Sequence, residues 1–247
     1  MSLIVKPSSL VIRITPRAIS LFALVTALST GCNTRSSQNE PAAVTPGPPQ
    51  EHSSGSERGL PGVQTYAHRL DEPSRDAWQR PEEVIELLEC RPGMTAVDLG
   101  AGTGYFLRYL SVAVGDEGRV LALDIEPATI DWLLARIEKE ELRNVHPAVV
   151  TPEDPALAAH SVDRILIANT WHHIPGRVVY AEKLVAPLRP GGLLLIVDFR
   201  MDSPEGPPRD RRLSSNTVVS ELEAAGFVVQ ILEESLPYHY VVVGRVP

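Results

Sequence analysis

The chain has 247 residues, of which 43% are hydrophobic and 22% charged, amounts that suit one globular domain of ordinary size with some sequence outside its core. Its 23 basic and 31 acidic residues give a formal net charge of −8. This acidic balance argues against a nucleic-acid-binding surface, which needs clustered Lys and Arg, so we expect a small-molecule partner and no nucleic acid.

Residues 1–31 have the pattern of an export signal. Basic residues precede the apolar stretch Ala18 to Leu28, which is too short to span a bilayer as a permanent helix. The segment Leu28 to Cys32 resembles the bacterial lipoprotein signal, in which the cysteine is lipidated, although Ser29 stands where that signal usually has Leu. The resemblance implies an exported lipoprotein that is anchored in a membrane through Cys32 and faces the periplasm. An ordinary cleaved signal or an uncleaved anchor is the alternative, and the protein is cytoplasmic if the signal is not used.

Residues 32–65 are rich in Ser, Pro, Gly and polar side chains and have almost no large apolar residue. Such a stretch buries too little surface to offset its ordering entropy, and we interpret it as a disordered tether. Cys90 is the only other cysteine, so a lipidated Cys32 leaves no pair for an intramolecular disulfide.

From residue 66 to the C-terminus, short apolar runs alternate with helical patterns. Pro81 with two following acids predicts a helix start. The later pattern predicts strands over 95–99, 120–124, 145–150, 164–168 and 193–199, and helices over 105–114, 128–140, 177–188 and 217–225. Strands separated by helices indicate a mainly parallel sheet that is covered on both faces. The last two runs, 227–232 and 240–245, have no helix between them and predict a hairpin.

The first strand is followed by a glycine-rich turn, Gly100 to Gly104, with three glycines in five positions. In an open parallel sheet this turn lies at the ligand-binding edge. Together with Val97–Gly104, the segments 123–127, 161–166 and 188–192 resemble the class I S-adenosylmethionine (SAM)-dependent methyltransferases, especially the ubiquinone and menaquinone biosynthesis C-methyltransferase branch. A dinucleotide-binding enzyme would have a glycine at position 105, where this chain has Tyr105.

The resemblance implies a Rossmann-like doubly wound α/β fold with a seven-stranded sheet, mainly parallel with one antiparallel strand near the C-terminus. It also implies SAM as the cofactor. Asp98 would hold its amino-acid portion, and Asp124 the ribose hydroxyls, with a helix N-cap as the alternative role of Asp124. The remaining expected contacts are the loop residues Gly100, Ala101, Gly102 and Gly104, Ile125 against the adenine, and Glu153 or Asp154 on the adenine amino group unless that segment is a solvated turn.

After the fourth strand the chain presents Asn169 for polar contacts, and His172 or His173 as a proton acceptor. The alternative is a structural histidine that packs and caps the next helix. Adjacent histidines without a carboxylate at helical spacing do not favour a metal site. The resemblance further implies an acceptor pocket formed by the helix around Trp78 and the insertion Met201–Leu213.

These observations predict an enzyme that methylates a small molecule by direct displacement. A membrane-tethered, non-catalytic module that binds SAM or a nucleoside on the same fold is the alternative. The sequence predicts no particular oligomeric state and no particular methylated atom.

Overall fold

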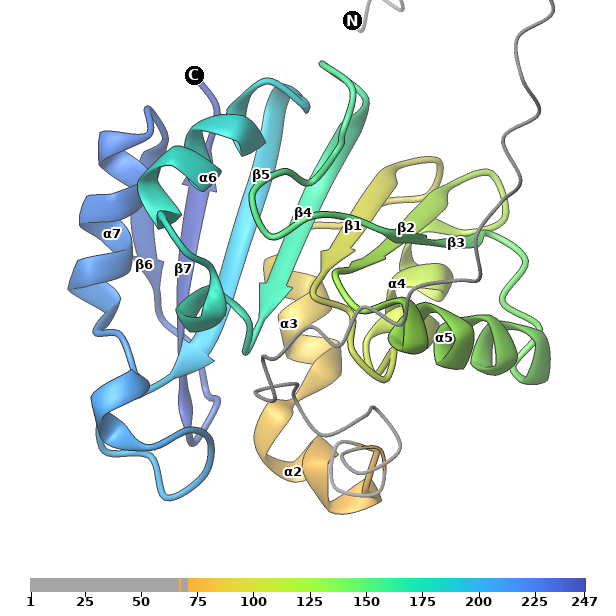
Figure 1. The fold of residues 1–247 in the computed structure, drawn as a ribbon, viewed down its shortest axis with the longest axis horizontal. Helices are drawn as coiled ribbons and strands as arrows, with labels where there is room; N and C mark the ends of the chain where they lie inside the picture. The colour runs from red at the N-terminus through yellow and green to blue at the C-terminus, as the bar shows by residue number, and fades with distance from the viewer. Residues whose placement is uncertain (1–66, 68–70) are drawn as a thin grey trace, which may run out of the picture. The chain divides into compact units, whose positions relative to one another are not determined.

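The computed structural model of the chain describes Ala67 and residues 71–247. The predictions for residues 1–65, namely the signal, Cys32 and the tether, lie outside the described residues. Seven strands and their helices alternate along the rest of the chain (Figure 1). The helices are α2 (Asp76–Gln79), α3 (Pro81–Leu87), α4 (Leu107–Val114), α5 (Pro127–Lys139), α6 (Arg177–Val185) and α7 (Ser215–Ala224). The strands are β1 (Thr95–Leu99), β2 (Arg119–Asp124), β3 (Val145–Val149), β4 (Val162–Ala168), β5 (Leu188–Phe199), β6 (Val228–Leu232) and β7 (His239–Arg245).

The strands form one sheet in the order β3-β2-β1-β4-β5-β7-β6. Neighbouring strands are parallel except for β7, which runs antiparallel to both β5 and β6. This confirms the predicted sheet, its single antiparallel strand and the C-terminal hairpin. Because the strand order reverses between β1 and β4, their carboxyl ends form the switch point at which such sheets bind ligands.

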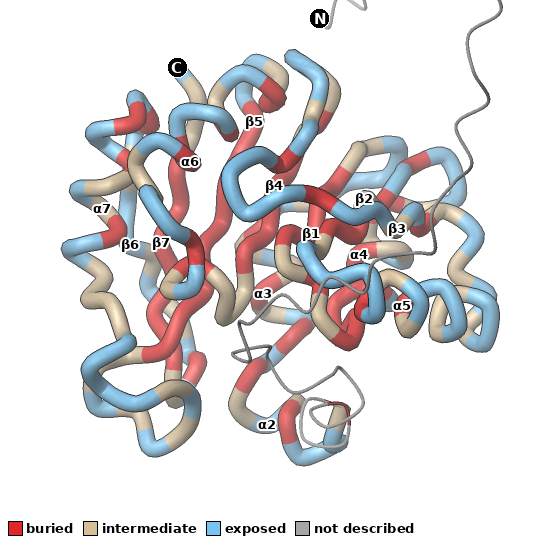
Figure 2. The backbone as a smooth tube through the Cα atoms, in the orientation of Figure 1, coloured by how far each residue is buried: buried red, intermediate tan, exposed pale blue. Residues whose placement is uncertain are grey.

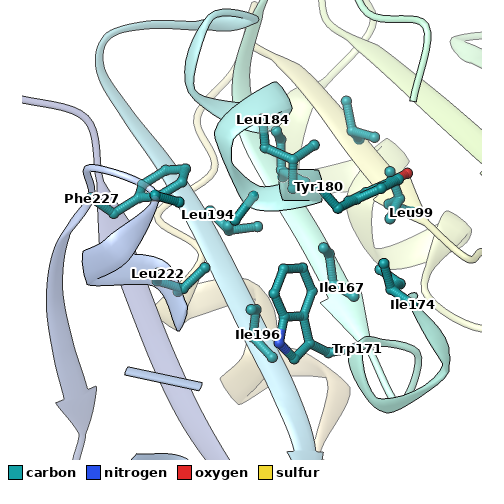
Figure 3. Packing of buried hydrophobic residues seen from close by; sticks show 14 of the residues in the cluster. Leu99, Ile167, Trp171, Ile174, Tyr180, Leu184, Leu194, Ile196, Leu222 and Phe227 are labelled. Atoms are coloured by element: carbon teal, nitrogen blue, oxygen red, sulfur yellow. The ribbon is translucent and has the colours of Figure 1, made fainter. Parts of the chain in front are cut away.

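The central strands are buried on both faces, as expected for a parallel sheet covered by helices (Figure 2). Successive residues of β4 show this alternation, since Ile165 and Ile167 belong to one core cluster and Leu166 to the other. The first cluster includes Tyr180 and Leu184 of α6, and Figure 3 shows Trp171 among its aliphatic side chains. The second cluster receives side chains from α3, α4 and α5. No helix in the part of the chain that the structure describes has the length and apolarity needed to cross a bilayer.

Most predicted element ends agree with the structure to within three residues, and the largest difference is the start of β5. The strand was expected from residue 193 but begins at Leu188, which pairs with Val162. The pairing resumes at Arg164 and Leu193, so β5 gains extra residues relative to β4 through Pro190, Gly191 and Gly192. These turn-forming residues predicted a boundary before the strand, but in the structure they form an irregularity inside it.

Candidate active site

The glycine-rich loop folds back from the end of β1 toward β2. The N–H groups of Gly100 and Ala101 both donate to the carbonyl oxygen of Leu123, at 2.8 and 3.0 Å. Gly100 has a φ of +78°, and a Cβ atom there would lie 2.4 Å from Cγ2 of Thr170. Both the backbone conformation and the close approach of Thr170 therefore require glycine at this position.

Asp98 precedes this loop and is almost completely buried, with 3% of its surface exposed. Its Oδ2 atom has no hydrogen-bond partner among the described residues. Burial, followed by the nearby charge of Asp124, raises the pKa of Asp98 to about 7, and Arg75 opposes this shift. A buried carboxylate oxygen without a donor provides a place for a donor group on a ligand.

Asp124, at the end of β2, organises the loop with its side chain. Its Oδ2 accepts from the N–H of Gly102 at 2.9 Å, and its Oδ1 accepts from the N–H of Glu126 at 3.2 Å. Helix α5 begins at Pro127 with Glu126 as its N-cap, so Asp124 supports the helix entry without being the cap residue itself. Of the two roles that the sequence left open for Asp124, ribose binding and helix N-cap, the structure gives the N-cap position to Glu126.

Two adjoining cavities lie at the carboxyl ends of the strands. The larger has a volume of about 440 Å³ and the smaller about 190 Å³. Gly100, Thr170 and His173 line both of them. Asp98 faces the larger cavity, whereas Asp124 and Ile125 line the smaller one. The glycine-rich loop therefore lies against both spaces.

The loop after β3 differs from the expectation for the adenine end of the site. Thr151 and Pro152 line the smaller cavity, but Glu153 and Asp154 line neither cavity. Helix α6 holds the exposed turn, because its residue Lys183 donates to the carbonyl oxygen of Glu153 at 2.7 Å. Asp154 accepts from the N–H of Ala156 at 2.8 Å, a hydrogen bond that lowers the pKa of the Asp154 carboxyl. This arrangement resembles the solvated turn that was the alternative interpretation.

Asn169, at the exit of β4, lies in the left-handed region with a φ of +56°. Its Nδ2 donates to Oε1 of Gln79 at 2.9 Å, while its buried Oδ1 has no partner within the described part of the chain. Asn169 and Asp98 both line the larger cavity. Two buried acceptor oxygens, one on each residue, are thus available for a ligand.

The two histidines after β4 have different surroundings. The side chains of His172 and its partner Asp198 are each only 3% exposed, and Nδ1 of His172 lies 2.9 Å from both carboxylate oxygens. His173 is exposed, and its pKa is lowered by partial burial and then by the neighbouring ring of His172. Both line the larger cavity, so the structure brings both candidate proton acceptors to it but pairs only His172 with a carboxylate.

Arg75, in the short helical turn Pro73–Arg75 that precedes α2, is a cavity residue that the sequence did not reveal. The guanidinium of Arg75 lies 3.8 Å from the ring centre of Tyr105 and 5.7 Å from that of Trp78. It also donates to Oε1 of Gln79 at 3.3 Å, and burial lowers the pKa of Arg75 to about 10. Sequence position gave no signal for Arg75, because its burial depends on contacts with rings that are distant in the chain.

Four aromatic side chains form an aromatic wall of the larger cavity, namely Trp78, Tyr105, Phe106 and Phe199. Behind it lies His239, which is fully buried, stacks on Trp78 at 5.6 Å and lies 4.4 Å from the ring of Phe199. Burial lowers the pKa of His239 to about 3, so this imidazole is neutral and extends the wall as an uncharged ring.

The loop after β5 completes the cavity with Glu205, Gly206 and Pro207. The side chain of Arg212 holds its path at several points. The guanidinium donates to four carbonyl oxygens, those of Arg200, Ser203, Glu205 and Pro207, over distances of 2.6 to 3.0 Å. Trp78 and the insertion after β5, which were both expected at the acceptor pocket, thus line the same cavity.

Comparison with known proteins agrees with this geometry. A family described as a methyltransferase domain matches residues 96–192. The ubiquinone/menaquinone biosynthesis C-methyltransferase UbiE of Shewanella frigidimarina is 29% identical over 123 residues, which are 49% of this chain and 48% of the relative. The chain spans about half the length of the curated relatives it matches.

Solved structures extend the similarity to the whole described fold. A SAM-dependent methyltransferase from Aquifex aeolicus is 30% identical, with a TM-score of 0.70 over 74% of this chain and 98% of that one. The phosphoethanolamine N-methyltransferase 2 of Haemonchus contortus, solved with S-adenosylhomocysteine, is 15% identical with a TM-score of 0.56 over 69% of this chain and 53% of that one. The latter likeness shows the fold alone. With the Aquifex enzyme matched over nearly its full length, the chain belongs to the class I SAM-dependent methyltransferases, and S-adenosylmethionine is its cofactor.

Proposed function

We propose that the protein transfers the methyl group of SAM to a small-molecule acceptor that binds in the larger cavity. The observation that supports this most directly is the contact between the two cavities at Gly100, Thr170 and His173. A donor that extends from the smaller cavity past this junction presents its reactive centre to the larger one. The remaining volume of the larger cavity is bounded by Trp78 and by the loop after β5.

The smaller cavity suits the nucleoside end of the donor. Asp124 offers carboxylate oxygens for the ribose hydroxyls, and the exposed side chain of Ile125 offers an apolar surface for adenine. Thr151 and Pro152, rather than Glu153, are the described residues of the β3 exit that face this space. We therefore assign the ribose contact to Asp124 and place Glu153 outside the donor contacts.

The larger cavity suits the amino-acid end of the donor on its inner side. The unpartnered Oδ2 of Asp98 matches an ammonium group, and the unpartnered Oδ1 of Asn169 provides a second acceptor. Arg75 lines the same cavity and supplies positive charge for a carboxylate. These three side chains fit a zwitterion, as the methionine portion of SAM requires.

When bound, SAM supplies a methyl group on a positively charged sulfur, whose departure as a neutral sulfide makes the methyl group easy to transfer. The chain's contribution is to position and desolvate the acceptor. Trp78 and Phe199 offer flat apolar faces, and neutral His239 behind them adds no charge. This wall favours an uncharged, flat acceptor, and the curated relatives are named for ubiquinone/menaquinone biosynthesis.

We also propose that residues 1–31 act as a signal, that Cys32 carries lipid and that residues 32–65 tether the domain (residues 66–247) to a membrane. Radiolabelled palmitate supplied to cells should label the wild-type protein and not Cys32→Ala. Protease added to intact cells should remove the domain if it faces outward. A wild-type protein that takes up no palmitate label would contradict lipidation.

The methyltransferase proposal is tested by donor binding. Calorimetry should detect S-adenosylhomocysteine binding to the full chain, and mass spectrometry should find SAM or its demethylated product in the purified protein. Asp98→Ala and Asp124→Ala should each weaken binding at least tenfold, whereas Glu117→Gln, at an exposed site away from both cavities, should not. Absence of binding by the wild type, or wild-type affinity in both aspartate variants, would refute the donor site.

A further inference from the structure

A buried imidazole and a buried carboxylate form a pair in the wall of the larger cavity. His172 lies in the short helical turn Trp171–His173 after β4, and Asp198 lies near the end of β5. The strands β4 and β5 are parallel neighbours, with Ala168 next to Val197, and this pairing brings the two side chains together. Each side chain is 3% exposed, which is a costly environment for a charge unless it is paired.

The carboxylate of Asp198 is held by backbone donors in addition to the ring. The N–H of Phe199 donates to Oδ1 at 2.8 Å, and the N–H of His172 donates to Oδ2 at 3.3 Å. Both carboxylate oxygens thus already accept backbone N–H groups, and this arrangement suits Asp198 as an acceptor at the ring. A neutral His172 ring that donates to this carboxylate carries its proton on Nδ1, which lies 2.9 Å from both oxygens.

This tautomer leaves Nε2 of His172 with a free lone pair. No hydrogen bond of Nε2 occurs among the described residues, and His172 lines the larger cavity. The other titratable groups facing the pair are His173, whose ring centre lies 4.1 Å from that of His172, and Tyr240, whose buried hydroxyl lies near Asp198. Arg211 lies near His173 and lowers the pKa of that neighbour.

We infer that His172 accepts, at Nε2, the proton that the methyl acceptor loses, and that Asp198 is the positioning residue that keeps Nδ1 protonated. This inference rests on the proposed function and names the chemistry of its acceptor. Imidazole deprotonates groups whose acidity is not far from its own, such as phenolic or enolic hydroxyls, much better than aliphatic alcohols. The acceptor is thus a neutral, flat compound with an acidic hydroxyl.

The step balances without an oxidant or a further reactant. The O–H bond of the acceptor breaks as the Nε2–H bond forms, and its electron pair remains on the acceptor and makes the bond to the methyl carbon. The pair of the broken sulfur–methyl bond stays on sulfur. His172 is left as an imidazolium beside ionised Asp198, which stabilises it until the proton passes to water.

The first test measures the ring itself and needs no turnover. Full-chain protein labelled with ¹⁵N-histidine and saturated with S-adenosylhomocysteine is followed by NMR from pH 5 to 10, and His172→Gln identifies the signals. We expect the neutral ring to carry its proton on Nδ1 and to leave Nε2 unprotonated. In Asp198→Asn the amide group donates to Nδ1 and should move the neutral proton to Nε2. A wild-type ring with its neutral proton on Nε2 overturns the inference.

The second test uses 1,4-dihydroxynaphthalene, kept reduced, as a flat phenolic probe. We expect the wild type to methylate it, with kcat reduced about 10²–10⁴-fold in His172→Gln and Asp198→Asn. Raising the pH should restore part of this rate, because an already ionised phenol needs no base. His146→Gln, at an exposed histidine on β3, is the matched control and should keep wild-type kinetics.

These outcomes separate the inference from the proposed function. Calorimetry on the same samples should give similar S-adenosylhomocysteine affinity for wild type, His172→Gln and Asp198→Asn. No binding by the wild type would refute the donor site and with it the proposed function. Binding without methylation of the probe would count against the phenolic acceptor class, and equal kcat in His172→Gln and wild type at every pH would overturn the role of His172.

Discussion

The two cavities are built in different ways. The smaller one is formed mostly by strand ends and the turns that follow them, such as Leu99–Gly100 and Asp124–Ile125. The larger one adds side chains from the N-terminal helix and from the loop after β5, which are more than a hundred residues apart. The site proposed for the nucleoside end of the donor is therefore a consequence of the sheet, whereas the aromatic wall proposed for the acceptor depends on packing between distant segments. Substitutions in the aromatic wall should therefore change binding of the acceptor with little effect on binding of the donor, and substitutions at the strand ends should do the reverse.

The largest effect is expected from Gly100→Ala, on the donor side. The new Cβ would meet Thr170 and the residue would keep a φ of +78°, so we expect S-adenosylhomocysteine affinity to fall more than about a hundredfold and unfolding free energy to fall by roughly 2–4 kcal/mol. Gly93→Ala is the matched control, because Gly93 has a φ of +85° but no atom within 4 Å of its Cβ position. Calorimetry and urea unfolding measure both; equal losses in the two variants would show that Thr170 is not the cause.

The next effect concerns His239, behind the acceptor wall. Its pKa is lowered to about 3, mainly by burial, so the folded protein binds fewer protons than the unfolded chain between about pH 6.5 and 3. The stability that neutral His239 provides is complete above pH 6.5 and is lost as the pH falls through this window. His239→Phe should remove roughly 3–5 kcal/mol of that acid-dependent loss. Urea unfolding at pH 7 and pH 4 measures it, and an unchanged difference between the two pH values would contradict the assignment.

A smaller effect is expected from Asp98, on the donor side. Burial raises its pKa to about 7, so the protonated form stabilises the free protein fully below about pH 4, and this contribution is lost as the pH rises through 7. An ammonium ligand needs the ionised form, and S-adenosylhomocysteine should bind roughly tenfold more tightly at pH 8 than at pH 6. Asp98→Asn should bind weakly with little dependence on pH and should unfold at higher urea concentration at pH 8. Calorimetry across this range decides the point; an equally steep profile in the variant would assign the titration to another group.

The smallest effect is expected from Trp78→Ala, on the acceptor side. Removal of this ring takes away one face of the aromatic wall and its stacking on His239, so we expect the KM for 1,4-dihydroxynaphthalene to rise roughly fivefold. S-adenosylhomocysteine affinity should stay within about twofold of the wild type, because Asp98, Asn169 and Asp124, which we assign to the donor, keep their side chains. Steady-state kinetics and calorimetry give the two numbers. A larger loss of donor affinity than of acceptor affinity would show that the two sides are not separable.

The order of elements, the sheet and the glycine-rich loop were predictable, because they depend on short-range patterns of apolar residues and glycine. The pairing of His172 with Asp198 was not, since it requires the register of β4 against β5. Burial of Arg75 and His239 likewise follows from tertiary contacts with aromatic rings. The acidic residues after β3 show an error in the other direction, a ligand contact predicted where the structure places a turn. Glu153 and Asp154 follow a strand end, as ligand-binding acids do, but Lys183 and the N–H of Ala156 bond to them in an exposed turn.

The hold of Arg212 on the loop after β5 has a consequence for how acceptor preference can change. Its guanidinium contacts only carbonyl oxygens, which every residue type possesses. These bonds hold the loop through its backbone, whereas Gly206 is constrained by the ring of Phe199, which a Cβ atom at this position would meet. Position 207, whose carbonyl oxygen is one of the four, is therefore a place at which a new specificity could be selected, by evolution or in the laboratory, without rebuilding the loop that presents it.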